Sequence, residues 1–387
     1  MLSRVASHLY WMARYLERAE NMARILDVGR SLALVSKGAA DELTAIEPLV
    51  ITNTLGAFDA SGRARTPEDV AGYLAWDELH GSSIFNCLRS SRENARAVRA
   101  DITTEMWEDI NNTWLQLLQK RHRESQPADN PFFEWVKERS HLFRGITFAT
   151  IRRDQPYHFI RLGTHLERAD NTARILSVKQ HNAAGSRTAG TAGEPPPGAV
   201  ARARSQSSGQ SQGQSQSQFQ GQGRQSQTQG GSAAAQSQAQ EMTPAQIRSK
   251  AQLQAQSQRQ GTTPFGGEIT DYYRLSAVLR SVSAFEAYRD TYRDAVEPRR
   301  VAELLILDPT LPRSLKFCFD EIVRTLEVLP DATAKPARRL AATIHAGLTY
   351  VDIDEIFDDD ITGYLEHFLV QIAELGDVVN EAYLELK

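Results

Sequence analysis

The sequence predicts an all-α protein: a single large helical-bundle domain built from two related halves and interrupted by a disordered insertion. Helical spacing and helix-start patterns occur almost everywhere, whereas alternating β-type runs bounded by hairpin turns are missing. An eleven-residue segment occurs twice, 150 residues apart. A Gln/Ser/Gly-rich tract separates the flanking helical stretches. We therefore expect a helical domain over residues 1–182 and 265–387, with the insertion at 183–264.

The helix starts are marked in order along the chain. Thr66-Pro67-Glu68-Asp69 combines a capping threonine, a proline at the first helical position and acids in the first turn. A second start lies at 101–105, and apolar residues follow it at helical spacing through Leu118. Residues 131–134 open a third helix, and Pro298, Pro312 and Pro336 divide the C-terminal part.

The insertion has a composition that cannot form a core. Residues 201–260 contain 20 Gln in 60 positions and almost no large apolar side chains, so burial cannot offset the entropy of ordering them. Residues 183–264 carry a charge of +5, which leaves −9 on the rest of a chain whose formal net charge is −4. An acidic body of this kind argues against a nucleic-acid partner.

Composition excludes further classes. No stretch approaches the roughly 18 consecutive apolar residues that a membrane-spanning helix needs, so we expect no membrane partner and a cytoplasmic location. The two cysteines, Cys87 and Cys318, are too few for a disulfide framework or a zinc cluster. Both are expected to pack in the core rather than to act as nucleophiles, because neither has a basic neighbour in the sequence.

The repeat carries most of the information. Leu16–Leu26 and Leu166–Leu176 are identical at nine of eleven positions, and Ser83–Cys87 resembles Ser314–Cys318. On a helical wheel Glu20 falls within an apolar face, where a carboxylate has to be paired. A polar cluster is therefore expected where the two halves meet. Its candidate residues are Glu17, Glu20, Asn21, Arg24, Glu167, Asp170, Asn171 and Arg174.

Two interpretations of this cluster remain open. It is either a buried salt-bridge network that sets helix register, or the lining of a cleft. In the cleft, Arg24 and Arg174 would bind carboxylate or phosphate, and the acids would hold an ammonium group or a metal.

Two other features favour structural roles. His165 is interpreted as a packed or surface histidine rather than a catalytic one. Six acids among residues 352–360 are interpreted as a turn that caps a helix starting near Ile361 rather than as a magnesium site.

Five segments together resemble the bacterial alpha-E domain family. They are residues 1–6, 9–21, 144–147, 162–170 and 281–289. The Gln-rich tract departs from the family pattern, as does Tyr273 or its neighbour, where a tryptophan is expected. The resemblance implies an all-helical protein fused to, or encoded beside, an unusual ATP-grasp protein. The resemblance also implies transglutaminase-like and proteasome-like proteins as further neighbours.

The implied function is that of an accessory or catalytic subunit in an ATP-grasp-dependent system that forms amide or peptide bonds. The duplicated cluster would bind an anionic amino-acid or peptide substrate. ATP and Mg²⁺ are expected on the partner, because this chain has no glycine-rich phosphate loop and no cofactor site of its own is expected. The alternative is a non-catalytic helical scaffold whose polar cluster is purely structural. Whether the chain itself is an enzyme stays open.

Overall fold

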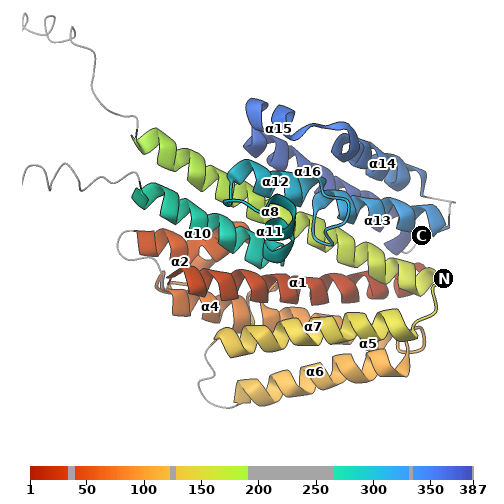
Figure 1. Ribbon diagram of the computed structural model, residues 1–387. Helices are drawn as coiled ribbons and strands as arrows, with labels where there is room; N and C mark the ends of the chain where they lie inside the picture. The colour runs from red at the N-terminus through yellow and green to blue at the C-terminus, as the bar shows by residue number, and fades with distance from the viewer. Residues whose placement is uncertain (34–39, 123–127, 191–264, 331–333, 386–387) are drawn as a thin grey trace, which may run out of the picture. The chain divides into compact units, whose positions relative to one another are not determined.

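The computed structural model describes residues 1–33, 40–122, 128–190, 265–330 and 334–385. No strand occurs in these ranges, and the predicted all-α class is confirmed (Figure 1). The first half contains α1 (Ser3–Ala33), α2 (Ala40–Ile51), α3 (Leu55–Ala60), α4 (Pro67–Trp76), α5 (Ile84–Ala97), α6 (Thr104–His122) and α7 (Asn130–Thr150). The second half contains α8 (Gln155–Gly190), α10 (Phe265–Ser281), α11 (Phe285–Tyr292), α12 (Pro298–Leu307), α13 (Leu315–Val328), α14 (Lys335–Tyr350), α15 (Ile353–Asp359), α16 (Ile361–Val379) and the π-helix η1 (Asn380–Leu384).

Helix starts follow the local chemistry that the sequence indicates. Thr66 accepts a hydrogen bond from the Asp69 backbone N–H and places Pro67 at the start of α4. Asp129 caps α7 in the same way through the Phe132 N–H. In each case a side-chain oxygen satisfies one of the free N–H groups of the first turn.

The two halves repeat the same element order. Helices α4 and α12 both begin with proline, at positions 231 residues apart, and α5 and α13 begin with the same separation. Asn53 and Ser283 both adopt a φ of 55° in the tight turns that follow α2 and α10. These shared starts and turns extend the duplication well beyond the eleven-residue segment.

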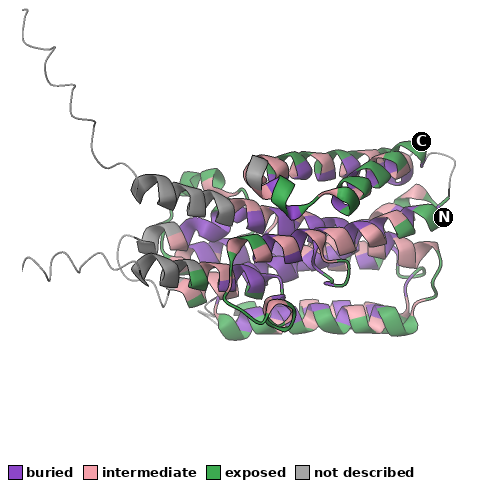
Figure 2. Cartoon of the chain, turned by 45° about the horizontal axis from the view of Figure 1, so that its top comes forward, coloured by how far each residue is buried: buried purple, intermediate pink, exposed green. Residues whose placement is uncertain are grey.

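Helix α1 lies at the centre of the first half, where it packs against α5, α7, α2 and α4 (Figure 1). Its apolar face is buried, including Leu9, Met12, Leu16 and Ala19. Buried residues line the inner faces of the helices and exposed residues cover the outer ones (Figure 2). This arrangement places the first copy of the repeat in the interior.

Helix α8 brings the second copy against the first. A Cβ atom on Gly163 would lie 2.4 Å from the Tyr10 carbonyl oxygen, so the two backbones approach as closely as only glycine permits. Arg14 hydrogen-bonds Glu167 one turn further along both helices. The two helices therefore run in the same direction with the repeats side by side.

The predicted insertion falls mostly outside the described residues. Helix α8 continues to Gly190, and residues 191–264 are not described. Residues 1–187 and 267–387 group into one compact unit. Within the described ranges, no helix is long and apolar enough to cross a membrane.

Candidate functional site

The duplicated Glu-Arg dipeptides exchange partners between α1 and α8. Arg168 binds Glu17 through two hydrogen bonds, from Nε to Oε1 at 2.9 Å and from Nη2 to Oε2 at 3.0 Å. Arg18 binds Glu167 in the same bidentate way, with distances of 2.6 and 2.9 Å. The pairing is thus reciprocal between the two copies of the repeat. We call these four residues the ER network.

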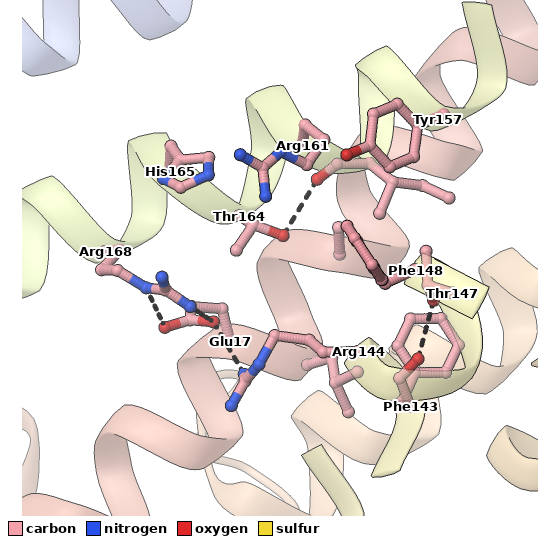
Figure 3. A pocket seen from close by; sticks show the side chains of 13 residues that line it. Glu17, Phe143, Arg144, Thr147, Phe148, Tyr157, Arg161, Thr164, His165 and Arg168 are labelled. Carbon is pink, nitrogen blue, oxygen red and sulfur yellow. Dashed lines mark hydrogen bonds and ion pairs between the residues drawn. The ribbon is translucent and has the colours of Figure 1, made fainter. Parts of the chain in front are cut away.

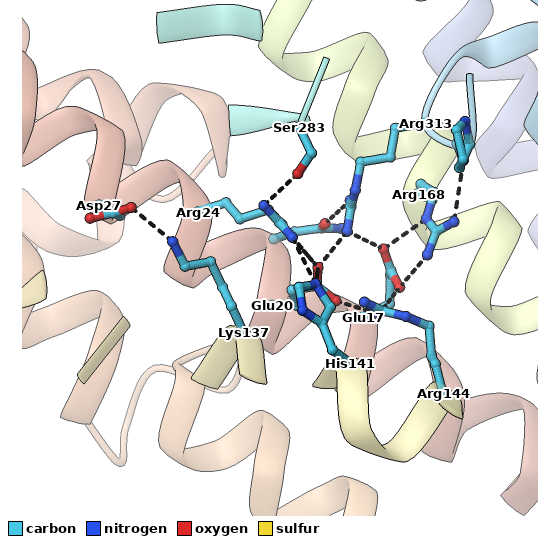
Figure 4. A network of polar contacts seen from close by, with 12 residues as sticks. Glu17, Glu20, Arg24, Asp27, Lys137, His141, Arg144, Arg168, Ser283 and Arg313 are labelled. Carbon is cyan, nitrogen blue, oxygen red and sulfur yellow. Dashed lines mark hydrogen bonds and ion pairs between the residues drawn. The ribbon is translucent and has the colours of Figure 1, made fainter. Parts of the chain in front are cut away.

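The Glu17 end of the network continues into a larger cluster (Figure 4). The Arg313 guanidinium lies 3.1 Å from Glu17 and 2.7 Å from Glu20, and it also donates to the Asn21 side-chain oxygen. Arg144 donates to both carboxylates from α7. Segments far apart in sequence thus meet on two adjacent acids of α1.

Arg24 closes the cluster on the side of the α10–α11 turn. Its Nε donates to Glu20 at 2.9 Å, its Nη1 donates to the Ser283 hydroxyl at 2.6 Å, and its Nη2 lies 3.1 Å from His141 Nε2. Because Ser283 sits at the positive-φ turn, the backbone of that turn determines where the hydroxyl meets the guanidinium.

The acids stay ionised although they are buried. Burial alone raises the pKa of Glu17, but Arg168 and Arg313 outweigh it and hold that pKa below its ordinary value. Arg313 and the His141 hydrogen bond act likewise against burial at Glu20, whose pKa lies well below normal. At Glu167, burial raises the pKa, but Arg18 and Arg14 lower it further, so the pKa is about 2. Opposite charge outweighs desolvation at all three.

Positive charge nevertheless exceeds negative charge around Glu17 and Glu20. Two carboxylates face four guanidinium groups, those of Arg24, Arg144, Arg168 and Arg313. Burial, together with the neighbouring guanidinium groups of Arg168 and Arg24, lowers the pKa of Arg313 to about 10 in spite of both acids. An added anion would relieve this repulsion.

A cavity of about 240 Å³ opens beside this surplus, and we call it the arginine cavity. It is lined by Glu20, Arg24, His141, Arg144, Arg168, Val282, Ser283, Leu311, Pro312 and Arg313. Four arginines and one glutamate make its lining strongly cationic. Guanidinium groups recognise carboxylate and phosphate through paired hydrogen bonds, so an anionic group is the ligand that this lining suits.

A cavity of about 230 Å³ lies beside the Glu167 end of the ER network, and we call it the asparagine cavity. It is lined by Arg18, Asn21, Met22, Ile25, Ile51, Thr52, Asn53, Ser82, Glu167, Asp170, Asn171 and Arg174. Two arginines and two acids balance the charge of this lining. Arg174 binds Asp170 on its own helix, through hydrogen bonds of 2.8 and 3.1 Å.

A third cavity, of about 90 Å³, lies between α1, α7 and α8 (Figure 3). Phe143, Phe148 and Tyr157 contribute to its lining, and Arg144 and Arg168 are shared with the arginine cavity. His165 also lines it and is buried. Burial and the nearby Arg168 lower the pKa of His165 well below its ordinary value, so the ring is neutral at neutral pH. A packed histidine agrees with this environment.

The structure divides the eight candidate residues among the three cavities. Glu20 and Arg24 line the arginine cavity, and Glu17, which shares their cluster through Arg313, lines the third cavity. Glu167, Asp170, Asn171 and Arg174 lie together at the asparagine cavity. Asn21 joins the two groups, since its oxygen binds Arg313 and the residue lines the asparagine cavity.

Sequence reasoning missed five arginines that hold the acids: Arg14, Arg18, Arg144, Arg168 and Arg313. Arg18 and Arg168 lie inside the repeat itself, so their repetition beside Glu17 and Glu167 was an available indication. Arg313 immediately precedes the duplicated Ser314 segment, but position 82 in the first copy is serine. Nothing in the repeat therefore marked it.

The two cysteines and the acids of residues 352–360 lie in environments that favour structural roles. Cys87 and Cys318 are buried, and burial raises the pKa of each thiol to about 12. Asp360 caps α16 through the Thr362 N–H, as the sequence predicts for a helix starting near Ile361, and Asp352 caps α15. Across the described ranges, no group of three or more His, Cys, Asp or Glu side chains is arranged to hold a metal ion.

Comparison with known proteins identifies a family without assigning an activity. No curated protein matches the chain, and no solved structure matches it. One family model, Alpha-E, matches residues 1–200 and 240–384, and it is described as a predicted alpha-helical domain with a conserved ER motif. The duplicated segment contains this dipeptide twice, as Glu17-Arg18 and Glu167-Arg168, at the α1–α8 contact. With both halves matched, the chain belongs to the Alpha-E family.

Proposed function

We propose that the chain is a substrate-binding subunit of an ATP-grasp-dependent system that forms amide or peptide bonds. It holds the anionic end of an amino-acid or peptide substrate in the arginine cavity. ATP and Mg²⁺ belong to the partner. The family resemblance supports the partner and the reaction class. The observation that carries the binding role is that four guanidinium groups line one cavity, whereas only two buried carboxylates, Glu17 and Glu20, pair with them.

The residues divide into a structural and a binding group. Both oxygens of Glu17 and both of Glu167 already accept hydrogen bonds from guanidinium groups, so these acids hold α1 and α8 together. Arg24 and Arg144 line the arginine cavity. Arg24 pairs with the carboxylate of Glu20, and Arg144 donates to Glu17 and Glu20 through its Nη1 atom. They supply the contacts to substrate.

The test is co-expression with an ATP-grasp protein of the kind that the family resemblance implies as its partner, followed by a search for a new amide product by mass spectrometry. Arg24→Gln should reduce product formation about ten- to hundredfold, because one charge-assisted hydrogen-bond donor is lost. Arg96→Gln is the matched control, since Arg96 pairs with Glu93 on the surface of α5 and should leave the product unchanged. Thermal unfolding of both variants shows that the fold is retained.

The saturation of the ER network also favours a second candidate, a non-catalytic scaffold that docks a partner enzyme. In that case Arg24→Gln leaves product formation at the level of the unmodified chain, and the ATP-grasp protein is still captured in a pull-down. Such a result would reject substrate binding at the arginine cavity.

A further inference from the structure

The arginine cavity and the third cavity follow one another along two helices, α7 and α8. On α7, His141 lines the arginine cavity, Arg144 lines both cavities, and Phe148 lines the third. On α8, Arg168 lines both cavities, and Tyr157 lines the third. Arg144 and Arg168 therefore form the boundary between the two cavities (Figures 3 and 4).

The third cavity is open because one side chain differs between the two copies of the repeat. Thr164 occupies the position that Arg14 has in the first copy, 150 residues earlier. Arg14 extends to Glu167, which it binds at 2.8 Å, and a Cβ atom on Gly376 of α16 would lie 3.9 Å from its Nη1. Thr164 is shorter, so the matching space beside Glu17 stays unfilled.

The size and lining of the third cavity suit an aliphatic group. Leu16, Phe143 and Ile160 are buried in its wall, and Phe148 is 63% exposed, so the cavity reaches the molecular surface. A dry apolar cavity of about 150 Å³ takes a benzene molecule. The third cavity measures about 90 Å³ and therefore suits a smaller group, such as the branched end of a leucine side chain.

Arg144 offers accessible hydrogen-bond donors at the boundary. In the parts of the chain that the structure describes, it donates only through Nη1, to Glu17 and Glu20, and its side chain is 30% exposed. Thr147 and Phe148 of the third cavity follow one turn later on α7, about 5 Å along the helix axis. This separation is close to the span of a leucine residue from its carboxylate to its methyl groups.

We propose that the two cavities bind one amphipathic ligand, a carboxylate that carries a branched aliphatic side chain. Its carboxylate accepts hydrogen bonds from Arg144 on the side of the arginine cavity. Its side chain enters the third cavity and packs against Leu16, Phe143 and Phe148. This inference rests on the proposed function for the binding of the anion, and it adds the class of side chain that the substrate carries.

Isothermal titration of the full chain with N-acetyl-leucine and N-acetylglycine tests the proposal, because the two probes share the carboxylate and differ in the side chain. N-acetyl-leucine should bind about ten- to hundredfold more tightly, as expected when a leucine side chain is buried. Arg24→Gln should weaken both probes by the same factor, since Arg24 lines only the arginine cavity of these two.

Thr164→Leu fills the third cavity without adding charge. It should reduce the affinity for N-acetyl-leucine to that for N-acetylglycine and leave N-acetylglycine binding unchanged. Thr343→Leu is the matched control, because both threonine hydroxyls donate to the carbonyl group four residues earlier, and Thr343 lies on the exposed face of α14. The control should leave the binding of both probes unchanged.

A second variant keeps the test decisive if Thr164→Leu impairs folding. Phe148→Ala removes an exposed ring from the cavity lining and should weaken N-acetyl-leucine alone, about threefold. Equal binding of the two probes by the unmodified chain would overturn the proposal and leave the anion site in place. Failure of both probes to bind would reject the anion site of the proposed function, and the amphipathic ligand with it.

Discussion

At the scale of single residues, the ER network should lose stability when either a carboxylate or a guanidinium group is removed. Glu167 accepts hydrogen bonds from Arg14 and Arg18, and its carboxylate is nearly inaccessible to solvent. Removing a carboxylate from such a site leaves guanidinium groups buried without compensation. This cost is usually larger than the net worth of the intact pair.

Glu167→Gln should therefore lower the free energy of unfolding at pH 7 by about 3–5 kcal/mol. The native pKa of Glu167, held at about 2 by Arg18 and Arg14 against burial, lies below the unfolded value. The unfolded chain thus binds the proton first as pH falls. The stabilisation is complete above the unfolded pKa, near 4.5, and is lost as pH drops towards 2.

Urea unfolding at a series of pH values measures this dependence. The difference between wild type and Glu167→Gln should shrink steadily below pH 4.5. Asp59→Asn is the control, because the pair of Asp59 with Arg65 is solvent-exposed and should contribute at most about 1 kcal/mol. A difference between wild type and Glu167→Gln that did not change with pH would contradict the assigned pKa.

At the scale of elements, the contact between α1 and α8 depends on the absence of a Cβ atom at Gly163. Gly163 allows the α8 backbone to lie against the Tyr10 carbonyl, and the bidentate pairs follow one to two turns later. A wider separation would stretch hydrogen bonds that now measure 2.6 to 3.0 Å. Packing of the two helices and pairing of the charges are therefore coupled.

Gly163→Ala should destabilise the fold by about 1–3 kcal/mol, the usual cost of overpacking, although alanine is the better helix former. Gly145→Ala is the matched control in α7, since a Cβ there meets nothing within 4 Å. It should stabilise the protein by up to about 1 kcal/mol. Thermal unfolding of the two variants should therefore shift in opposite directions, and shifts of the same sign would rule out the close contact.

At the scale of the whole molecule, duplication provides two similar halves and the ER network joins them through α1 and α8. The family model matches both halves and leaves out residues 201–239, which belong to the Gln-rich tract. The family's helical domain therefore does not require this tract.

A chain lacking residues 201–239 should unfold at the same temperature as the full chain, within a few degrees. The reason is that none of the buried helical contacts described above involves the deleted residues. Differential scanning calorimetry measures the midpoint and the cooperativity of unfolding. A large fall in the midpoint, or a second transition, would show that the tract contributes to the fold.

The sequence by itself determined the all-α class, the duplication and the helix starts at Pro67, near Ile361 and, within one residue, at Pro131, because capping and periodicity are local properties. It also indicated that Glu20 needs a charged partner, since a carboxylate on an apolar helix face must be paired. Arg24, four residues later, was found in this way.

Only the tertiary structure decided which arginine meets which acid. Arg313 reaches Glu17 and Glu20 across nearly 300 positions, and Arg144 reaches them from α7. Such pairings depend on how helices cross, which no local pattern encodes. The sequence predicts a single cluster, whereas the structure contains two cavities of different charge. Arg313 lines one cavity, and Ser82 stands at the equivalent position of the other. A duplicated motif determines equivalent places, whereas the non-repeated neighbours determine what each place can bind.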